Sequence, residues 1–189
     1  MANGRTSSDQ KKAKKERGVV LYQDEAVFQQ AGTVIRTWAL VGIGVQMLTP
    51  PVRKSVKVMG AVRIGAQPKW HSRFVRVFNA ETFIEFLNQL LRYYRGIKIH
   101  LITDNAPYHK SPEVWEWIKG KEDLIELHFL PAYSPKLNAV EYLWRKTKRA
   151  ITHNKFFPRL QDLKEALMRR FNRFQGNPAS LRSAIPYFA

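Results

Sequence analysis

Residues 97–107 read IKIHLITDNAP, and this stretch decides the fold class. Its first seven residues form a short apolar run rich in isoleucine, which predicts a buried strand over residues 97–103. Asp104 stands where this strand ends. In open sheets that are covered by helices, ligand sites collect at the carboxyl ends of the strands. The simplest alternative is a turn, because Asp104 and Asn105 followed by Pro107 are typical turn residues.

The sequence on either side of this strand alternates between helix and strand. A helix is expected over residues 79–95, where Asn79 can cap its start and Gly96 can end it. After the strand, residues 111–120 predict a short helix and residues 124–130 another strand. Two amphipathic helices are expected at the end of the chain, over residues 138–153 and 160–176.

Three strands are expected before the first helix. They cover residues 18–28, 33–41 and 55–64, and the short links between them suggest an antiparallel meander. The full order is then three strands, helix, strand, helix, strand, helix, helix. This order predicts an α/β fold with a mixed sheet and helices on both faces, which is the ribonuclease H-like arrangement.

The charge of the chain is strongly positive. It has 32 Lys and Arg residues against 15 Asp and Glu residues, which gives a formal net charge of +17. A single-sign excess of this size favours a polyanionic partner, most simply nucleic acid, over a merely solvated surface. Charge alone does not separate an enzyme from a ribosomal or architectural protein. Because the chain has no cysteine, disulfides and thiolate zinc sites are excluded.

The length of 189 residues favours one domain. Residues 1–17 are polar and basic and are expected to form a flexible arm or the remnant of a linker, which leaves residues 18–189 as the folded domain. The start lacks the apolar segment of a secretory signal, and no apolar run is long enough to cross a membrane. We therefore expect a cytoplasmic, nucleoid-associated protein that is not secreted and has no membrane partner.

Three acids are candidates for a shared site. Asp24 lies in an apolar strand next to Glu25, and strand alternation sends the two to opposite faces, so only one of them is expected in a given site. Either can instead face solvent or meet an arginine, and Glu141 can instead cap the helix that starts at Asn138. Together with Asp104, however, these acids offer the oxygen ligands that Mg²⁺ prefers. Two such ions can activate a nucleophile and stabilise the leaving oxygen in phosphoryl transfer.

A resemblance that is strongest from Asp104 to Trp144 sharpens this hypothesis. Asp-Asn-Ala at 104–106 with His109, LPAYSP at 130–135, LN at 137–138, Glu141 and Trp144 is similar to the pattern of the mariner superfamily of DDE transposases, closest to its bacterial and archaeal insertion-sequence branch. Asp24 with Glu25 resembles the first acid of that family, in which the Asp is the ligand. Arg-Thr-Trp at 36–38 with Gly42 resembles the second strand of the family and its turn.

The resemblance implies the site and its chemistry. It implies a DDE catalytic domain of ribonuclease H-like fold that cleaves DNA at transposon ends and transfers the new 3′ end into target DNA. By this resemblance, Asp24, Asp104 and Glu141 hold two Mg²⁺ or Mn²⁺ ions, with Asn105 and His109 beside them. Taken alone, His109 is more often a packed or turn histidine than a ligand. The implied partners are double-stranded DNA and a second copy of the chain in the active complex.

The sequence departs from this family at its start. Family members carry an N-terminal helix-turn-helix region that recognises the transposon ends, and the 23 residues before Asp24 are too few for it. We expect that region on a separate or frameshifted polypeptide, or to have been lost by truncation. Two alternatives stay open: a catalytically silent or domesticated DNA-binding remnant, and a ribonuclease H-like nuclease that cuts RNA–DNA hybrids.

Basic residues after Glu141 are the candidate DNA contacts. The stretch over residues 142–159 contains no acid. Its cations cannot all share one face of a helix, so some are expected to be merely solvated. Those that we consider are Arg145, Lys146, Lys148, Arg149, Lys155 and Arg159, and the DNA contacts are expected chiefly from Arg145, Lys148, Arg149 and Lys155.

Overall fold

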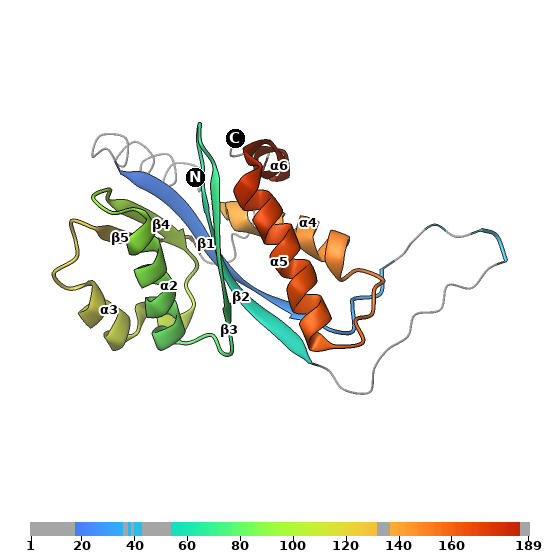
Figure 1. Cartoon of the computed structure of the whole chain (residues 1–189). Coiled ribbons are helices and arrows are strands. Elements are labelled where there is room, and N and C mark those ends of the chain that lie inside the picture. The colour runs from blue at the N-terminus through green and yellow to red at the C-terminus, as the bar shows by residue number, and fades with distance from the viewer. Residues whose placement is uncertain (1–17, 36–37, 39, 43–53, 132–136, 186–189) are drawn as a thin grey trace.

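The computed structural model describes residues 18–35, 38, 40–42, 54–131 and 137–185 (Figure 1). Its centre is a five-stranded sheet in the order β3-β2-β1-β4-β5. The strands are β1 (Val19–Gln29), β2 (Ser55–Arg63), β3 (Lys69–Val75), β4 (Ile99–Thr103) and β5 (Ile125–Phe129). The helices are α2 (Ala80–Tyr93), the short 3₁₀ helix η1 (Pro107–Lys110), α3 (Pro112–Ile118), α4 (Ala139–Ile151), α5 (Leu160–Gly176) and α6 (Pro178–Ala184).

The sheet is mixed, as expected. β1, β2 and β3 pair antiparallel, whereas β4 and β5 run parallel to β1. The last pair between β1 and β4 joins Tyr22 to Ile102, so β1 continues past the end of β4. Asp24 therefore lies in the stretch of β1 beside which β4 has just ended, and Asp104 follows that end.

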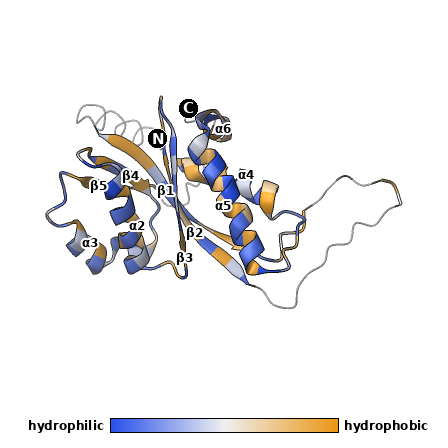
Figure 2. Ribbon diagram, in the orientation of Figure 1, coloured by the Kyte–Doolittle hydropathy of each residue, from blue (hydrophilic) through white to orange (hydrophobic). Residues whose placement is uncertain are grey.

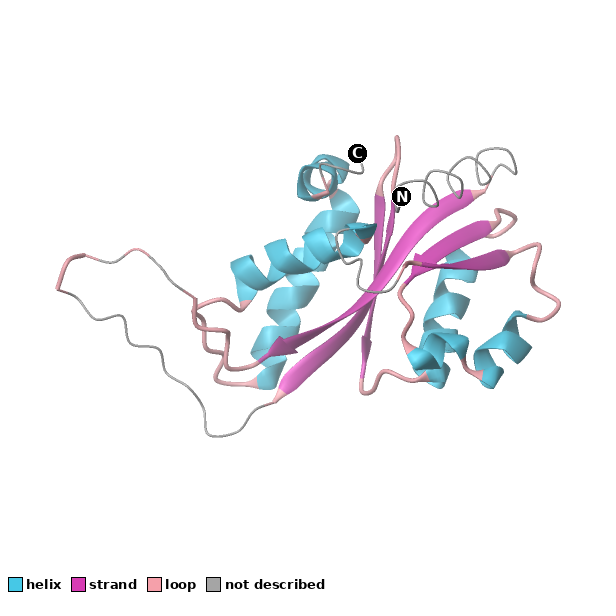
Figure 3. Cartoon of the chain, turned by 180° about the vertical axis from the view of Figure 1, so that it is seen from behind, coloured by secondary structure: helices cyan, strands magenta, loops and turns pink. Residues whose placement is uncertain are grey.

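Helices cover both faces of the sheet. α2 and α3 lie on one face, and α4, α5 and α6 lie on the other (Figures 1 and 3). Residues of β1 alternate between the two layers: Tyr22 and Phe28 pack in the core under α4–α6, and Val19 and Leu21 pack in the core under α2. Hydrophilic and hydrophobic residues alternate along α5 (Figure 2), as expected for a helix with one face on the core.

The larger core is held by aromatic side chains. Trp70 of β3 and Trp144 of α4 are fully buried and meet edge to face, with ring centroids 5.2 Å apart. Phe171 of α5 lies against both rings. A Cβ at Gly60 of β2 would come within 2.4 Å of the Trp70 ring, so only glycine leaves room for this packing.

The prediction of a second strand over residues 33–41 is wrong. The described part of residues 33–41 lies in no strand, and Trp38 and Val41 are fully exposed. Ile35 instead exchanges hydrogen bonds with the side chain of Asn154: its N–H donates to Oδ1 (2.8 Å) and its carbonyl accepts from Nδ2 (3.1 Å). The third antiparallel strand is β3, which the sequence pattern did not reveal.

The other expected elements are confirmed to within a few residues. Asn79 caps α2 as expected, because its side chain accepts a hydrogen bond from the Thr82 N–H at 3.0 Å. The additional helix α6 begins after Asn177, which caps it through the Ser180 N–H. None of the described helices is both long and apolar enough to cross a lipid bilayer. The expected arm over residues 1–17 lies outside the described residues.

Candidate active site

Asp24 is a partly buried acid among other acids. It pairs with Gly60 across β1 and β2. Burial raises the pKa of Asp24 to about 8, and the negative charges of Glu141, Glu25 and Asp104 act in the same direction. Its Oδ2 atom is buried and has no hydrogen-bond partner among the described residues. Such an atom lacks compensation for the water that it loses, which a bound cation would supply.

Asp104 follows β4 and is better compensated. Its Oδ1 accepts a hydrogen bond from the Ala106 N–H at 3.0 Å and lies 3.0 Å from Nδ1 of His109. The His109 contact and the Ala106 N–H hold the pKa of Asp104 below its usual value, against the effect of burial. Half of the Asp104 side chain remains exposed, so it is open to a ligand. The expected turn is also present, since Asp104 accepts from the residue two positions ahead.

His109 joins Asp104 to Glu25. It lies on η1 and is fully buried, with Nδ1 facing Asp104 and Nε2 3.1 Å from Oε1 of Glu25. Burial alone would lower the pKa of His109, but the bonds to Asp104 and Glu25 raise it to about 9. The imidazolium donates to both carboxylates in this state, and Phe83 of α2 packs on its ring with centroids 4.3 Å apart.

Glu25 is the site residue that sequence reasoning missed. Alternation does send it to the face of β1 opposite Asp24, where it also accepts from Nε2 of Gln23 at 2.6 Å. Because β4 ends here, both acids nevertheless adjoin the Asp104 cluster. Ligand atoms of Glu25, Asp104 and His109 all lie within 4.8 Å of one another. The signal available in the sequence was the adjacent pair Asp24 and Glu25.

Glu141 is carried by the first turn of α4. Asn138 fixes this turn: its Oδ1 accepts from the Val140 N–H at 3.1 Å, and its Nδ2 donates to the Gln23 carbonyl at 2.9 Å. The second bond ties the start of α4 to β1 beside Asp24. The cap that the structure describes at the start of α4 is the Asn138 side chain, and the Glu141 side chain makes no described capping bond there.

Asn105 lies at the rim of this site. It is exposed, donates through Nδ2 to the Leu130 carbonyl after β5, and accepts from Nζ of Lys110. Asn105 therefore ties the ends of β4 and β5 together. It contacts none of the three acids through a hydrogen bond that the structure describes.

The cations of α4 fall on different sides of the helix. Arg145 and Lys148 follow Glu141 at four and seven residues, so the three share one side. Lys146 lies away from Glu141, and its Nζ donates to the Ser183 carbonyl. Arg149 borders a hollow of about 380 Å³ that is also lined by Tyr142, Arg145 and Lys146. Beyond the helix, Nζ of Lys155 donates to the Ala150 carbonyl at 2.8 Å.

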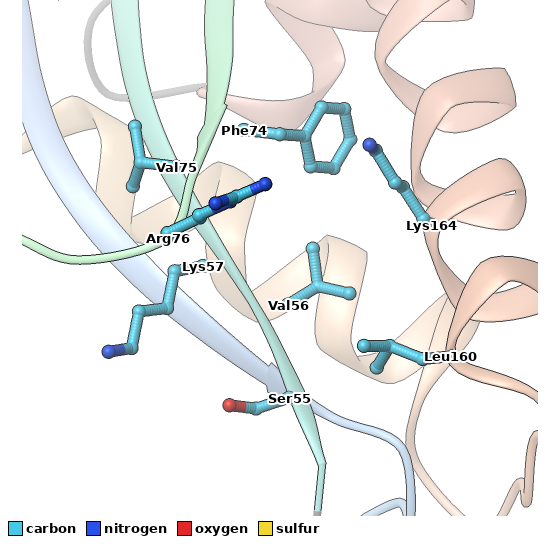
Figure 4. A pocket seen from close by; sticks show the side chains of 8 residues that line it. All are labelled: Ser55, Val56, Lys57, Phe74, Val75, Arg76, Leu160 and Lys164. Atoms are coloured by element: carbon cyan, nitrogen blue, oxygen red, sulfur yellow. The ribbon is translucent and has the colours of Figure 1, made fainter. Parts of the chain in front are cut away.

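A second basic groove lies near the start of β2 (Figure 4). It has a volume of about 390 Å³ and is lined by Lys57 of β2, Arg76 after β3, Lys164 of α5 and apolar neighbours that include Phe74. Nζ of Lys164 lies 5.5 Å from the centre of the Phe74 ring. None of the described residues that line this groove is acidic. These three cations are far apart in the chain, so no local sequence pattern groups them.

Comparison with known proteins identifies the family. Residues 19–164 match the model of the DDE superfamily endonucleases. The chain is 32% identical over 136 residues to the insertion element IS630 uncharacterized 39 kDa protein of Shigella sonnei, which covers 71% of this chain and 39% of that protein. It is 34% identical over 70 residues to the transposable element Tcb2 transposase of Caenorhabditis briggsae, which covers 34% of this chain and 25% of that protein.

Solved structures agree on the fold. The Mos1 strand transfer complex has a TM-score of 0.62 at 16% identity over 97% of this chain and 57% of that chain. The Mos1 mariner paired end complex with Mn has a TM-score of 0.59 at 19% identity, over 90% and 54% of the two chains. The Mos1 mariner catalytic domain matches over 97% and 91% with a TM-score of 0.52 at 15% identity, so the ribonuclease H-like fold is confirmed. This chain belongs to the DDE superfamily of endonucleases.

Proposed function

We propose that this chain is the catalytic domain of an insertion-sequence transposase that cleaves DNA and joins the new 3′ end to target DNA. The observation that carries the proposal is the buried Oδ2 of Asp24, which lacks a hydrogen-bond partner among the described residues and is surrounded by the charges of Glu141, Glu25 and Asp104. Repulsion among these acids is relieved by a divalent cation, which is the cofactor that the family implies.

Asp24, Asp104 and Glu141 are the proposed ligands, for two Mg²⁺ or Mn²⁺ ions. His109 contacts both Asp104 and Glu25, but Glu25 is the weaker candidate because only 11% of its side chain is exposed and it also accepts from Gln23. The buried oxygen of Asp24 and the exposed half of Asp104 are the groups left to bind a cation. When bound, two such ions supply Lewis acidity at the attacking and leaving oxygens of a phosphodiester.

The residues of this chain position that site. Asn138 holds α4 against β1, which keeps Glu141 near Asp24. His109 fixes the carboxylate of Asp104 and separates its charge from that of Glu25. Phe83 covers the His109 ring and excludes water from that side. His109 is thus a positioning residue in this proposal.

Double-stranded DNA, as transposon ends and target, is the proposed partner. Arg145 and Lys148 lie on the Glu141 side of α4, so phosphates next to the reacting one would meet them first. Arg149 and Lys155 extend this surface. The groove formed by Lys57, Arg76 and Lys164 offers a second place for the backbone of a duplex.

The chain spans about two-fifths of the length of the insertion element protein that it matches. Recognition of specific DNA ends by a helix-turn-helix polypeptide, and pairing of two copies in the active complex, are therefore parts of the proposal. The protein would act where the element resides, which we expect to be the nucleoid in the cytoplasm.

The decisive experiment uses Glu141→Gln in the complete transposase. The change removes the negative charge that a hard dication needs and keeps the size of the side chain. We expect unchanged melting without metal, retained DNA binding, and loss of Mg²⁺-dependent cleavage and strand joining by orders of magnitude. The substrate is a duplex that carries the terminal inverted repeats of the element.

Two comparisons make this result interpretable. Asn79→Ala removes a helix cap of the same kind from α2 and should cost about 1 kcal/mol of stability, with cleavage retained. Full cleavage by Glu141→Gln would overturn the three-carboxylate site. DNA binding without cleavage by the wild type would favour the alternative of a silent DNA-binding remnant.

A further inference from the structure

A second cluster of metal-ligating side chains lies on β4 and β5 and shares no residue with the candidate active site. His100 is opposite Glu126 in the parallel register, and His128 is opposite Ile102. Alternation therefore places His100, Glu126 and His128 on one face of the sheet. His100 is the second residue of β4, whereas Asp104 follows its last residue. His100 and Asp104 are therefore four residues, or roughly 13 Å, apart along the strand.

The distances among the three side chains fit a small metal ion. His100 Nδ1 lies 3.2 Å from His128 Nε2 and 3.7 Å from Oε2 of Glu126. His128 Nε2 lies 3.8 Å from Oε1 of Glu126. Ligands about 2.0–2.1 Å from a tetrahedral Zn²⁺ lie about 3.3–3.4 Å apart. Shifts of a few tenths of an ångström would bring all three ligand atoms onto one ion.

The His100 ring is already held in place. It is fully buried, and a Cβ on Gly18 would come within 2.9 Å of its Cδ2 atom. The backbone at Gly18 therefore packs directly on the ring and restricts its rotation. The side chains of His128 and Glu126 are 14% and 31% exposed, so the cluster opens to solvent on their side, where a water can complete four-fold coordination.

The donor set separates this cluster from the active site. Two imidazole nitrogens and one carboxylate suit Zn²⁺, Co²⁺ or Ni²⁺, whereas the acids around Asp24 suit Mg²⁺ or Mn²⁺. Lys98 opposes binding, because its Nζ lies 3.4 Å from Oε2 of Glu126 and a dication must displace it.

We propose that His100, Glu126 and His128 form a second metal site, for Zn²⁺ or a similar transition-metal ion, that ties β4 to β5. These strands end at Asp104 and at Leu130, whose carbonyl accepts from Asn105. A metal that bridges these two strands braces the platform that carries the active site. This metal would have a structural role and would take no part in DNA cleavage or strand joining.

The test measures Zn²⁺ binding in a background that lacks the catalytic carboxylates. The full chain with Asp24→Asn and Asp104→Asn is stripped with a chelator, dialysed against Zn²⁺, and assayed for bound metal and for melting. We expect one tight Zn²⁺ per chain and a rise in melting temperature, since a ligand that binds only the folded state stabilises it. Co²⁺ in its place should give the visible absorption of a tetrahedral nitrogen and oxygen site.

Three variants in that background identify the ligands. His128→Gln and Glu126→Gln should each weaken Zn²⁺ binding at least ~10-fold, because losing a ligand costs no less than losing a supporting hydrogen bond. Lys98→Met should tighten it, because the competing ammonium is gone. His153→Gln, which changes a histidine after the C-terminal end of α4, should leave it unchanged. The absence of Zn²⁺ binding, or an equal affinity in His128→Gln, Glu126→Gln and the background, would overturn the proposal and leave the active site untouched.

Discussion

Asp24 and Glu25 are neighbouring acids with opposite surroundings. Glu25 has a charged partner in His109 at 3.1 Å, whereas Oδ2 of Asp24 is buried without a hydrogen bond among the described residues. The sequence predicted Asp24, Asp104 and Glu141 as candidates, and the structure brings their charges together. It did not predict the link from Glu25 through His109 to Asp104, because that link depends on where β4 ends relative to β1, which no local pattern encodes.

Asp24→Asn is expected to separate metal binding from folding. Without metal, folding at pH 7.5 requires Asp24 to take up a proton, because its pKa is about 8 in the folded chain and ordinary in the unfolded chain. Asn needs no proton, so the melting temperature at pH 7.5 should rise. With Mn²⁺, the wild type should gain stability by mass action and the variant should gain much less. Thermal melts with chelator and with Mn²⁺ measure both effects. Equal Mn²⁺ shifts in the two proteins would rule out Asp24 as a ligand.

His71 is expected to make folding sensitive to acid. Burial, with a smaller effect from the charge of Lys69, lowers its pKa to about 4, and its Nε2 lies 2.9 Å from the Tyr94 hydroxyl. The unfolded chain binds a proton at this residue below pH 6.5 and the folded chain does so only near pH 4, so stability falls as the pH drops through this window. His71→Gln should make the fall between pH 6.5 and 4 shallower in denaturant titrations. An identical slope in the two proteins would show that His71 does not titrate in this way.

At the scale of elements, the strongest patterns were those of the helices and of β4. The caps at Asn79 and Asn138 and the apolar run of β4 are local and appeared where expected. Residues 33–41 have the composition of a strand, but the described part of that segment lies against Asn154 and outside the sheet. β3 (KWHSRFV) has three charged or imidazole side chains among seven residues, and its place is set by pairing with β2 and by the burial of Trp70.

The two sides of α4 give a matched pair of substitutions for DNA binding. Lys148→Ala removes a cation on the Glu141 side, and Lys146→Ala removes one that donates to the Ser183 carbonyl on the other side. We expect Lys148→Ala to weaken duplex binding for all sequences alike and to reduce the slope of log affinity against log salt by about 0.9. Lys146→Ala should leave that slope unchanged. Equal effects of the two variants would place the DNA on another face of α4.

At the scale of the whole molecule, one sheet serves two cores. β1 supplies alternate side chains to both layers, so neither layer has a complete core without the strand that it shares with the other. The order of elements was sufficient to predict this sandwich of helices around a mixed sheet. The charge excess favours a polyanionic partner, and this stays a prediction. The two basic surfaces were not both predictable, because Lys57, Arg76 and Lys164 meet only after β2, β3 and α5 have packed.

The shared strand predicts that both layers unfold together. Leu87 of α2 and Leu167 of α5 are fully buried in different cores, and truncating either to Ala should cost about 2–5 kcal/mol. If β1 couples the cores, Leu87→Ala should reduce the protection of α5 amides against hydrogen exchange as much as that of α2 amides. Leu167→Ala should likewise reduce the protection of α2 amides as much as that of α5 amides. Met168→Ala, next to Leu167 but exposed, is the control and should change neither. Loss of protection confined to the mutated layer would mean that each core opens alone, and the active site, which joins β1 and β4 to α4, would then lie on a boundary between two independently opening units.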